Sequence, residues 1–287
     1  MGFKWSLVSI PDHLGVENVG GRIGAALGPR AFWEIFQKMG GHRPDERAIL
    51  GSLTRHHTLD PVKTDISANH DAASELVAEA AREGGRSIVI GGGHDHGYSH
   101  LLGIRKWLGP EARIGCVNID AHLDVRKPSP KISSGCPFYL ALENQIIQPK
   151  DLIEFGIQTH CNSPELWQYA HERQIQVKLW KDMRNGKATE LFRESLEKLE
   201  RQVDAIVISL DLDSTAESFA PGVSAPQSEG FTSTELVELC EIAGGNEKVF
   251  SLGVFELNPL HDVGGRTARL AATAVFHYLE SARDIRV

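Results

Sequence analysis

Three apolar runs in this chain each end in histidine or aspartate, and this constrains its fold more than any other feature. The polar residues that follow the runs are His94, then Asp120, His122 and Asp124, then Asp211 and Asp213. In an extended strand, side chains two residues apart point to the same face. The three strand ends would therefore bring two imidazoles and four carboxylates to one place. Four negative charges cannot stay close together without cations, so the sequence predicts a metal site with room for two ions.

The apolar runs alternate with helical patterns along the whole chain. Strands are predicted at residues 5–10, 87–90, 114–119, 152–157, 176–179, 205–210 and 249–255. Helices are predicted at residues 66–83, 165–173, 189–202, 233–243 and 267–282. Apolar strands that alternate with helices indicate a parallel sheet covered on both faces, in which ligands bind beyond the carboxyl ends of the strands. We find no internal repeat or linker and expect a single domain over residues 1–287.

Composition excludes several classes of protein. Hydrophobic residues make up 41% of the chain, which is enough for a sizeable core. The net charge of -8 argues against a general binder of nucleic acid or of acidic membranes, and no stretch is apolar enough to span a membrane. The cysteines at 116, 136, 161 and 240 are scattered and form no Cys-x-x-Cys pair, so we expect reduced thiols in a cytoplasmic protein.

The types of candidate ligand indicate the class of metal. Carboxylate oxygen together with imidazole nitrogen suits Mn(II), Fe(II), Co(II), Ni(II) or Zn(II), and the absence of cysteine from the motifs argues against a structural zinc site. Two divalent cations would balance four carboxylates and could share a water molecule whose pKa they lower. Asp211 and Asp213 alone could cap a helix, and Asp120 to Asp124 alone could form a structural ion site. Together they favour a catalytic site.

The turn at residues 91–96 leaves one choice open. It reads Gly-Gly-Gly-His94-Asp95-His96, and either histidine could reach a metal at the strand end. His100 follows one helical turn after His96, and we expect it to face away from the site or to pack.

Seven segments distributed over the chain resemble the ureohydrolase superfamily of arginase, agmatinase and formimidoylglutamase. They lie at residues 20–29, 91–94, 120–124, 134–138, 209–213, 220–226 and 255–259. The resemblance implies a three-layer αβα sandwich with a central parallel sheet of about eight strands. It also implies two Mn(II) ions per subunit, and a homo-oligomer with a small-molecule substrate. The ligands that it implies are His94, Asp120, His122, Asp124, Asp211 and Asp213, and His96 then lies behind the site.

The loop at residues 133–138 indicates the subfamily. Arginases and agmatinases carry a histidine in this loop, whereas here it reads Ser-Ser-Gly-Cys-Pro-Phe. This pattern is similar to formimidoylglutamase, although threonine is more usual at the position of Cys136. We expect Cys136 to form part of the pocket wall, because no activating base is evident beside it. The resemblance implies hydrolysis of N-formimidoyl-L-glutamate to L-glutamate and formamide, in histidine degradation.

The resemblance also implies roles for individual residues. Asp124 would take a proton and pass it to the leaving amine. Glu256 would pair with the cationic formimino group, since a carboxylate suits a planar N–C–N cation. The two carboxylates of the substrate require positive charge, for which Arg126 is the first candidate, followed by Arg22 and Arg266.

Three alternatives remain at this point. The nearest is an amidinohydrolase that acts on arginine, agmatine or another guanidino compound, against which the missing loop histidine and the several arginines count. Another is a metal-binding relative without catalysis, against which the full ligand set and Glu256 argue. The third is an amidohydrolase similar to histone deacetylases, which uses one zinc ion and would not need the duplicated ligands.

Overall fold

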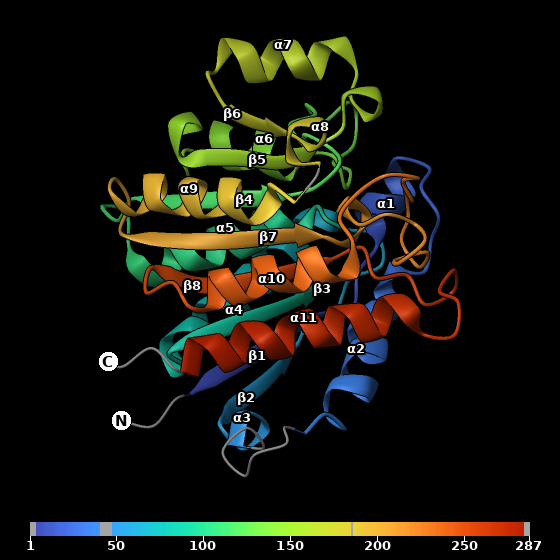
Figure 1. Ribbon diagram of the computed structural model, residues 1–287, viewed down its shortest axis with the longest axis vertical. Helices are drawn as coiled ribbons and strands as arrows, with labels where there is room; N and C mark the ends of the chain where they lie inside the picture. Colours follow the sequence, from blue (N-terminus) through green and yellow to red (C-terminus); the bar gives the residue numbers. More distant parts are fainter. Residues whose placement is uncertain (1–3, 41–47, 185, 284–287) are drawn as a thin grey trace.

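A computed structural model describes residues 4–40, 48–184 and 186–283 of the chain. Its centre is an eight-stranded sheet in the order β2-β1-β3-β8-β7-β4-β5-β6, and every neighbouring pair is parallel. Figure 1 shows the strands stacked from β2 at one end to β6 at the other. The strands are β1 (Trp5–Ile10), β2 (Leu53–Thr58), β3 (Arg86–Gly91), β4 (Ile114–Ile119), β5 (Leu152–Ile157), β6 (Gln176–Leu179), β7 (Ala205–Asp211) and β8 (Val249–Phe255).

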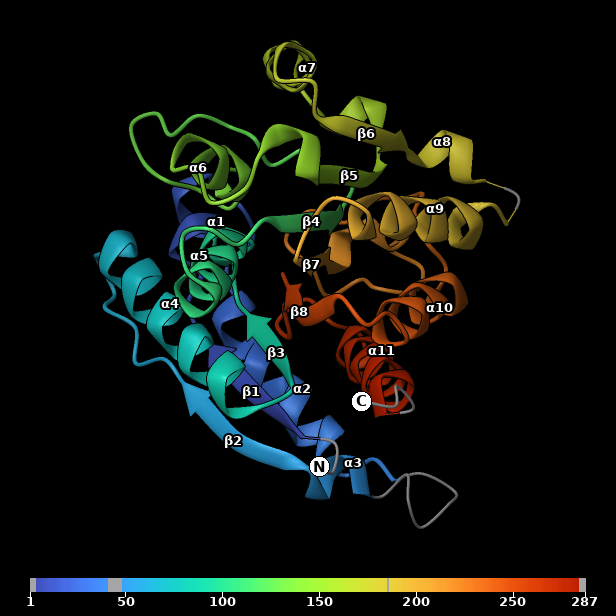
Figure 2. The same ribbon diagram turned by 90° about the vertical axis from the view of Figure 1, so that its left-hand side faces the viewer.

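Helices cover both faces of the sheet, because its central strands bury apolar residues on both sides. Ile88 and Ile90 belong to one hydrophobic core, and Val89 between them belongs to the other. The first core is closed by α2 (Gly28–Phe36), α9 (Ala188–Glu200), α10 (Ser233–Gly244) and α11 (Arg266–Arg283). The second is closed by α4 (Ile66–Glu83), α5 (His96–Leu108) and α6 (Pro137–Glu143). Figure 2 shows these layers on opposite sides of the sheet, which confirms the predicted three-layer α/β fold.

The predicted strands all form, and β2 is the strand that the sequence pattern did not reveal. Its residues read Leu-Thr-Arg-His-His-Thr, and only His57 is buried. An edge strand has one neighbour and one exposed side, so it lacks the apolar run that marks a central strand.

The predicted helices form within two residues of their expected ends. α4 begins where it was expected, and Asp65 caps it by accepting a hydrogen bond from the Ala68 amide at 2.9 Å. The helices α2, α5 and α6 were not predicted. The remaining short helices are α1 (Leu14–Asn18), α3 (Ala48–Gly51), α7 (Pro164–Glu172) and α8 (Trp180–Met183). Among the described residues, no helix combines the length and hydropathy needed to cross a membrane.

Candidate metal centre

Four adjacent strands deliver polar side chains to one edge of the sheet. β3, β8, β7 and β4 are neighbours in the sheet. His94 follows β3, Glu256 follows β8, Asp211 ends β7 and Asp120 follows β4. Because all four strands run in the same direction, their carboxyl ends meet, and residues far apart in the sequence become neighbours.

One group of ligands surrounds the His94 imidazole. Its Nδ1 lies 3.1 Å from Asp120 Oδ2, 3.0 Å from Asp124 Oδ2 and 3.1 Å from Asp211 Oδ2. This nitrogen is buried and makes no hydrogen bond of good geometry to any described residue. A divalent cation placed among these four atoms could be bound by the imidazole nitrogen and the three carboxylate oxygens.

A second group lies beside the first and shares one carboxylate with it. His122 Nδ1 is 3.3 Å from Asp120 Oδ1 and 3.2 Å from Asp213 Oδ2. Asp120 therefore turns one oxygen toward each group. The structure thus brings together all six residues named as ligands from the sequence. They form two groups, and within each group the candidate ligand atoms all lie within 4.8 Å of one another. A carboxylate between two such groups is placed to bridge two cations.

The acid–base properties of the cluster show the same need for positive charge. Burial raises the pKa of Asp124 to about 6, with a contribution from Asp120. Burial and the neighbouring Asp211 raise the pKa of Asp213 well above its usual range. Burial opposes protonation of His122, yet Asp213 and Asp120 raise its pKa well above the usual value. Without cations, the cluster would hold protons in order to limit its negative charge.

Two acidic residues at the site adopt left-handed backbone conformations that side chains seldom take. Asp124 has φ of 47° and Glu256 has φ of 65°. Hydrogen bonds hold both: the Asp124 carbonyl accepts from the Phe138 amide at 3.1 Å, and the Glu256 amide donates to the Gly92 carbonyl at 2.8 Å. The Glu256 Oε1 atom also accepts from the His94 amide at 2.9 Å. The strand ends are thus bent so that both carboxylates turn into the site.

The orientation of the His94 ring is fixed by its neighbours. Its Nε2 lies 2.8 Å from Ser209 Oγ, and its ring stacks on Phe255 with centroids 5.0 Å apart. At Gly91 a Cβ would lie 2.3 Å from the Phe255 ring, so only glycine leaves room for this stack. Our sequence reasoning missed Ser209, although its spacing of two residues before Asp211 places it on the same face of β7.

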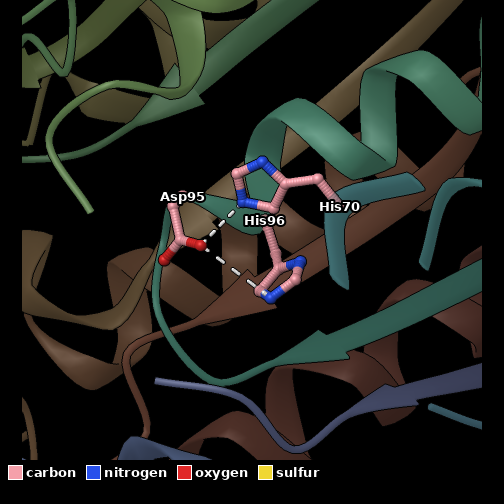
Figure 3. A group of neighbouring side chains, drawn as sticks. All are labelled: His70, Asp95 and His96. Atoms are coloured by element: carbon pink, nitrogen blue, oxygen red, sulfur yellow. Dashed lines mark hydrogen bonds and ion pairs between the residues drawn. The ribbon is translucent and has the colours of Figure 1, made fainter. Parts of the chain in front are cut away.

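The structure places His94 among the carboxylates of the cluster and His96 in a separate buried group behind the turn, with His70 and Asp95. Figure 3 shows one oxygen of the Asp95 carboxylate facing the rings of both His70 and His96. His70 Nε2 is 2.8 Å from Asp95 Oδ2, and His96 Nε2 is 3.0 Å from Asp12 Oδ2. These pairs hold the turn that presents His94. His100 is also packed, with Nε2 2.6 Å from Ser251 Oγ.

A cavity of about 170 Å³ opens onto the ligand cluster. Its walls include the side chains of Glu256 and Arg126, and its other lining residues come from the first loop and from residues 134–135 and 224–225. Within the described part of the chain, the Arg126 guanidinium has no hydrogen-bond or ion-pair acceptor. The cavity therefore places a free positive charge near the negative cluster.

The other two candidate arginines have different positions. Arg22 donates to the carbonyls of Val223 at 2.5 Å and Ser224 at 3.2 Å, so it anchors a loop that lines the cavity. The structure does not bring Arg266 to this cavity, contrary to our expectation. Its guanidinium donates to the Ser218 carbonyl at 2.8 Å and lines a different cavity, between α10 and α11. Arg266 lies there because it is the first residue of α11, which packs on one face of the sheet.

Cys136 lies under the cavity wall and does not form it. Ser134 and Gly135 line the cavity, while the Cys136 thiol is buried and accepts from the Ser133 amide at 3.3 Å. Burial raises the pKa of this thiol. The prediction that Cys136 forms part of the pocket wall is therefore wrong, because the neighbouring Gly135 lines the cavity instead. The raised pKa argues against a nucleophilic thiolate.

Comparisons with known proteins agree with this geometry. The model of the Arginase family matches residues 4–280. The chain is 32% identical to formimidoylglutamase of Staphylococcus carnosus (strain TM300), over 92% of this chain and 82% of the relative. It is 33% identical to formimidoylglutamase of Klebsiella pneumoniae, over 90% of this chain and 79% of the relative. A crystal structure of Trypanosoma cruzi formiminoglutamase with Mn2+ matches with a TM-score of 0.89 and 25% identity, over 99% of this chain and 95% of that one.

Proposed function

Because this chain belongs to the arginase family, we propose that it hydrolyses N-formimidoyl-L-glutamate to L-glutamate and formamide at a centre of two Mn(II) ions. The observation that carries this proposal is the pair of ligand groups that share Asp120 beside a cavity that also holds Arg126. The substrate has an amidine at one end and two carboxylates at the other. The negative cluster suits the first end, and the arginine suits the second.

The charge of the cavity favours this substrate over agmatine. Agmatine ends in an ammonium group, which Arg126 would repel across a cavity of about 170 Å³. The curated relatives described above are named formimidoylglutamase, which supports the same choice.

The residues present fit two divalent cations. The unpaired His94 Nδ1 among three carboxylate oxygens would hold one ion, and His122 with Asp213 would hold the other, with Asp120 between them. When bound, two Mn(II) ions would supply the positive charge that lowers the pKa of a water molecule and stabilises the negative charge on its oxygen.

The protein's own groups would carry the proton and hold the substrate. Asp124 lines the cavity and would accept a proton from the attacking water, then deliver it to the nitrogen that leaves with glutamate. Glu256 Oε2 has no partner among the described residues and lines the same cavity, so it would accept hydrogen bonds from the N–C–N cation. Water adds to the formimino carbon, the bond from that carbon to the glutamate nitrogen breaks, and formamide and glutamate leave.

Metal dependence provides the direct test of this function. We expect Mn(II)-loaded protein to release glutamate and formamide from N-formimidoyl-L-glutamate, and metal-free protein to release neither until Mn(II) is returned. Both products would be followed by chromatography. A metal-free protein with full activity would contradict the proposal, as would a loaded protein that leaves the substrate intact.

Replacing Arg126 should weaken substrate binding more than it slows the reaction. We expect Arg126→Ala to raise KM for N-formimidoyl-L-glutamate by about 10- to 100-fold with little change in kcat, since a charged hydrogen bond is worth about 1.5–3 kcal/mol. Steady-state kinetics measures both constants. The matched control is Arg193→Ala, an exposed arginine of α9 that lines another cavity and should leave KM unchanged. An unaltered KM in Arg126→Ala would show that the substrate's carboxylates bind elsewhere.

Further parts of the proposal follow from the family. They are a place in histidine degradation, a single catalytic domain over residues 1–287, a homo-oligomeric assembly and a cytoplasmic location. The names of the curated relatives support the first, and the single sheet that carries every proposed ligand supports the second.

A further inference from the structure

Three polar side chains form a row across the sheet directly below the ligand cluster. Ser209 of β7, Asn118 of β4 and Glu154 of β5 are paired in register. They are 1%, 0% and 0% exposed, respectively. Asn118 lies two residues before Asp120 and Ser209 lies two residues before Asp211, so the row and these two carboxylates share one face of the sheet.

Hydrogen bonds link this row to the cluster. Ser209 bonds His94, as described above. The Asn118 amide donates to Glu154 Oε2 at 2.8 Å and to Asp120 Oδ2 at 3.3 Å. Glu154 thereby connects to the carboxylate that faces both ligand groups, through a single amide with two hydrogens.

Glu154 is an unfavourable residue for the stability of the core. Its Oε1 has no hydrogen-bond partner among the described residues, and neither has Asn118 Oδ1. Burial raises the pKa of Glu154 well above its usual range, although the hydrogen bond from Asn118 lowers this pKa. A buried carboxyl with an unsatisfied oxygen costs free energy of folding. Packing alone therefore does not explain a glutamate at this position of β5.

We propose that Glu154 is a positioning residue of the metal centre: by accepting from the Asn118 amide, it directs that amide toward Asp120. This inference rests on the proposed metal centre. Without an acceptor at position 154, the Asn118 side chain could turn its carbonyl oxygen toward Asp120, and two acceptors would then oppose each other. With Glu154 in place, the donor faces Asp120 and fixes the carboxylate between the two ligand groups.

The test separates metal binding from stability. Glu154→Met has similar length and no acceptor oxygen, whereas Glu154→Gln keeps one. We expect Glu154→Met to weaken Mn(II) binding by about 10- to 100-fold, as is typical when a group that orients a ligand is lost, and Glu154→Gln to stay within about threefold of wild type. Calorimetry on metal-free protein measures the affinity. Metal-free Glu154→Met should melt at or above the temperature of metal-free wild type, because a buried carboxyl with one unsatisfied oxygen has been removed.

Two further variants guard against a merely structural explanation. Ile153→Val, on the opposite face of β5, should lower the melting temperature without changing Mn(II) affinity. Asn118→Ala should weaken binding as Glu154→Met does, and the double variant should bind no more weakly than Asn118→Ala alone. Losses that add, or an unchanged affinity in Glu154→Met, would overturn the inference. A wild-type protein that binds no Mn(II) would instead refute the metal centre itself.

Discussion

Asp120→Asn is expected to lower kcat for N-formimidoyl-L-glutamate by more than about 10³-fold. Losses of about 10- to 100-fold are typical for groups that only orient a ligand, and Asp120 faces both ligand groups directly. In the wild type, Asp120 Oδ1 accepts a hydrogen bond from the His122 amide at 2.7 Å. Asparagine has the same shape, and its side-chain oxygen can still accept this hydrogen bond. The variant should therefore fold and bind fewer than two Mn(II) ions, as measured by elemental analysis alongside kinetics.

The control for this variant is a second buried aspartate outside the cluster. Asp151 is buried and pairs with Arg113 at 2.7 Å. Asp151→Asn should lower the melting temperature while Mn(II) content and kcat stay at wild-type values. If Asp120→Asn retained two ions and wild-type turnover, Asp120 would not be the shared ligand.

Glu256→Gln is expected to lower kcat/KM by about 10²-fold or more while both Mn(II) ions remain bound. Loss of one partner from a buried charge pair costs about 2–5 kcal/mol, and each 1.36 kcal/mol corresponds to a factor of ten. Glutamine keeps an oxygen for the His94 amide but removes the negative charge that would face the formimino cation. In the metal-free protein, burial and then Asp211 raise the pKa of Glu256 to about 8, and cations beside Asp211 would favour the ionised form.

Metal content distinguishes this role from a structural one. Glu256→Gln should bind Mn(II) with wild-type stoichiometry, whereas Asp120→Asn should not. Equal loss of metal in both variants would indicate that Glu256 acts by holding the His94 turn. Activity within about threefold of wild type would show that the substrate cation is not paired with Glu256.

The sequence alone predicted the layers of the fold and the cluster of six side chains, for a clear physical reason. Parallel strands end at a common edge, and this rule needs no tertiary information to predict that the segments after β3, β4 and β7 meet. The period of two residues does not itself place Asp124, because β4 ends at Ile119 and Asp124 has a φ of 47°. Sequence rules also left open which of His94 and His96 lies among the carboxylates, because that depends on the path of a glycine turn and on the group formed by His70 and Asp95.

What escaped prediction depends on register and on the path of loops. Glu154 lies within the run Leu-Ile-Glu-Phe-Gly-Ile, and only the pairing of β4 with β5 places it beside Asn118. Arg266 was assigned to the substrate because it is a nearby arginine in a family motif, yet its loop carries it to another cavity. The edge strand β2 lacks an apolar pattern because most of its residues are exposed.

We propose that the negative cluster and Arg126 together select an amidine with an acidic tail. The most direct test is a comparison of kcat/KM for N-formimidoyl-L-glutamate, arginine and agmatine with the same Mn(II)-loaded protein. We expect kcat/KM for N-formimidoyl-L-glutamate to be at least about tenfold above that for either guanidino compound, since a hydrogen bond to a charged group is worth about 1.5–3 kcal/mol. Release of urea from arginine or agmatine at a comparable or higher kcat/KM would contradict it.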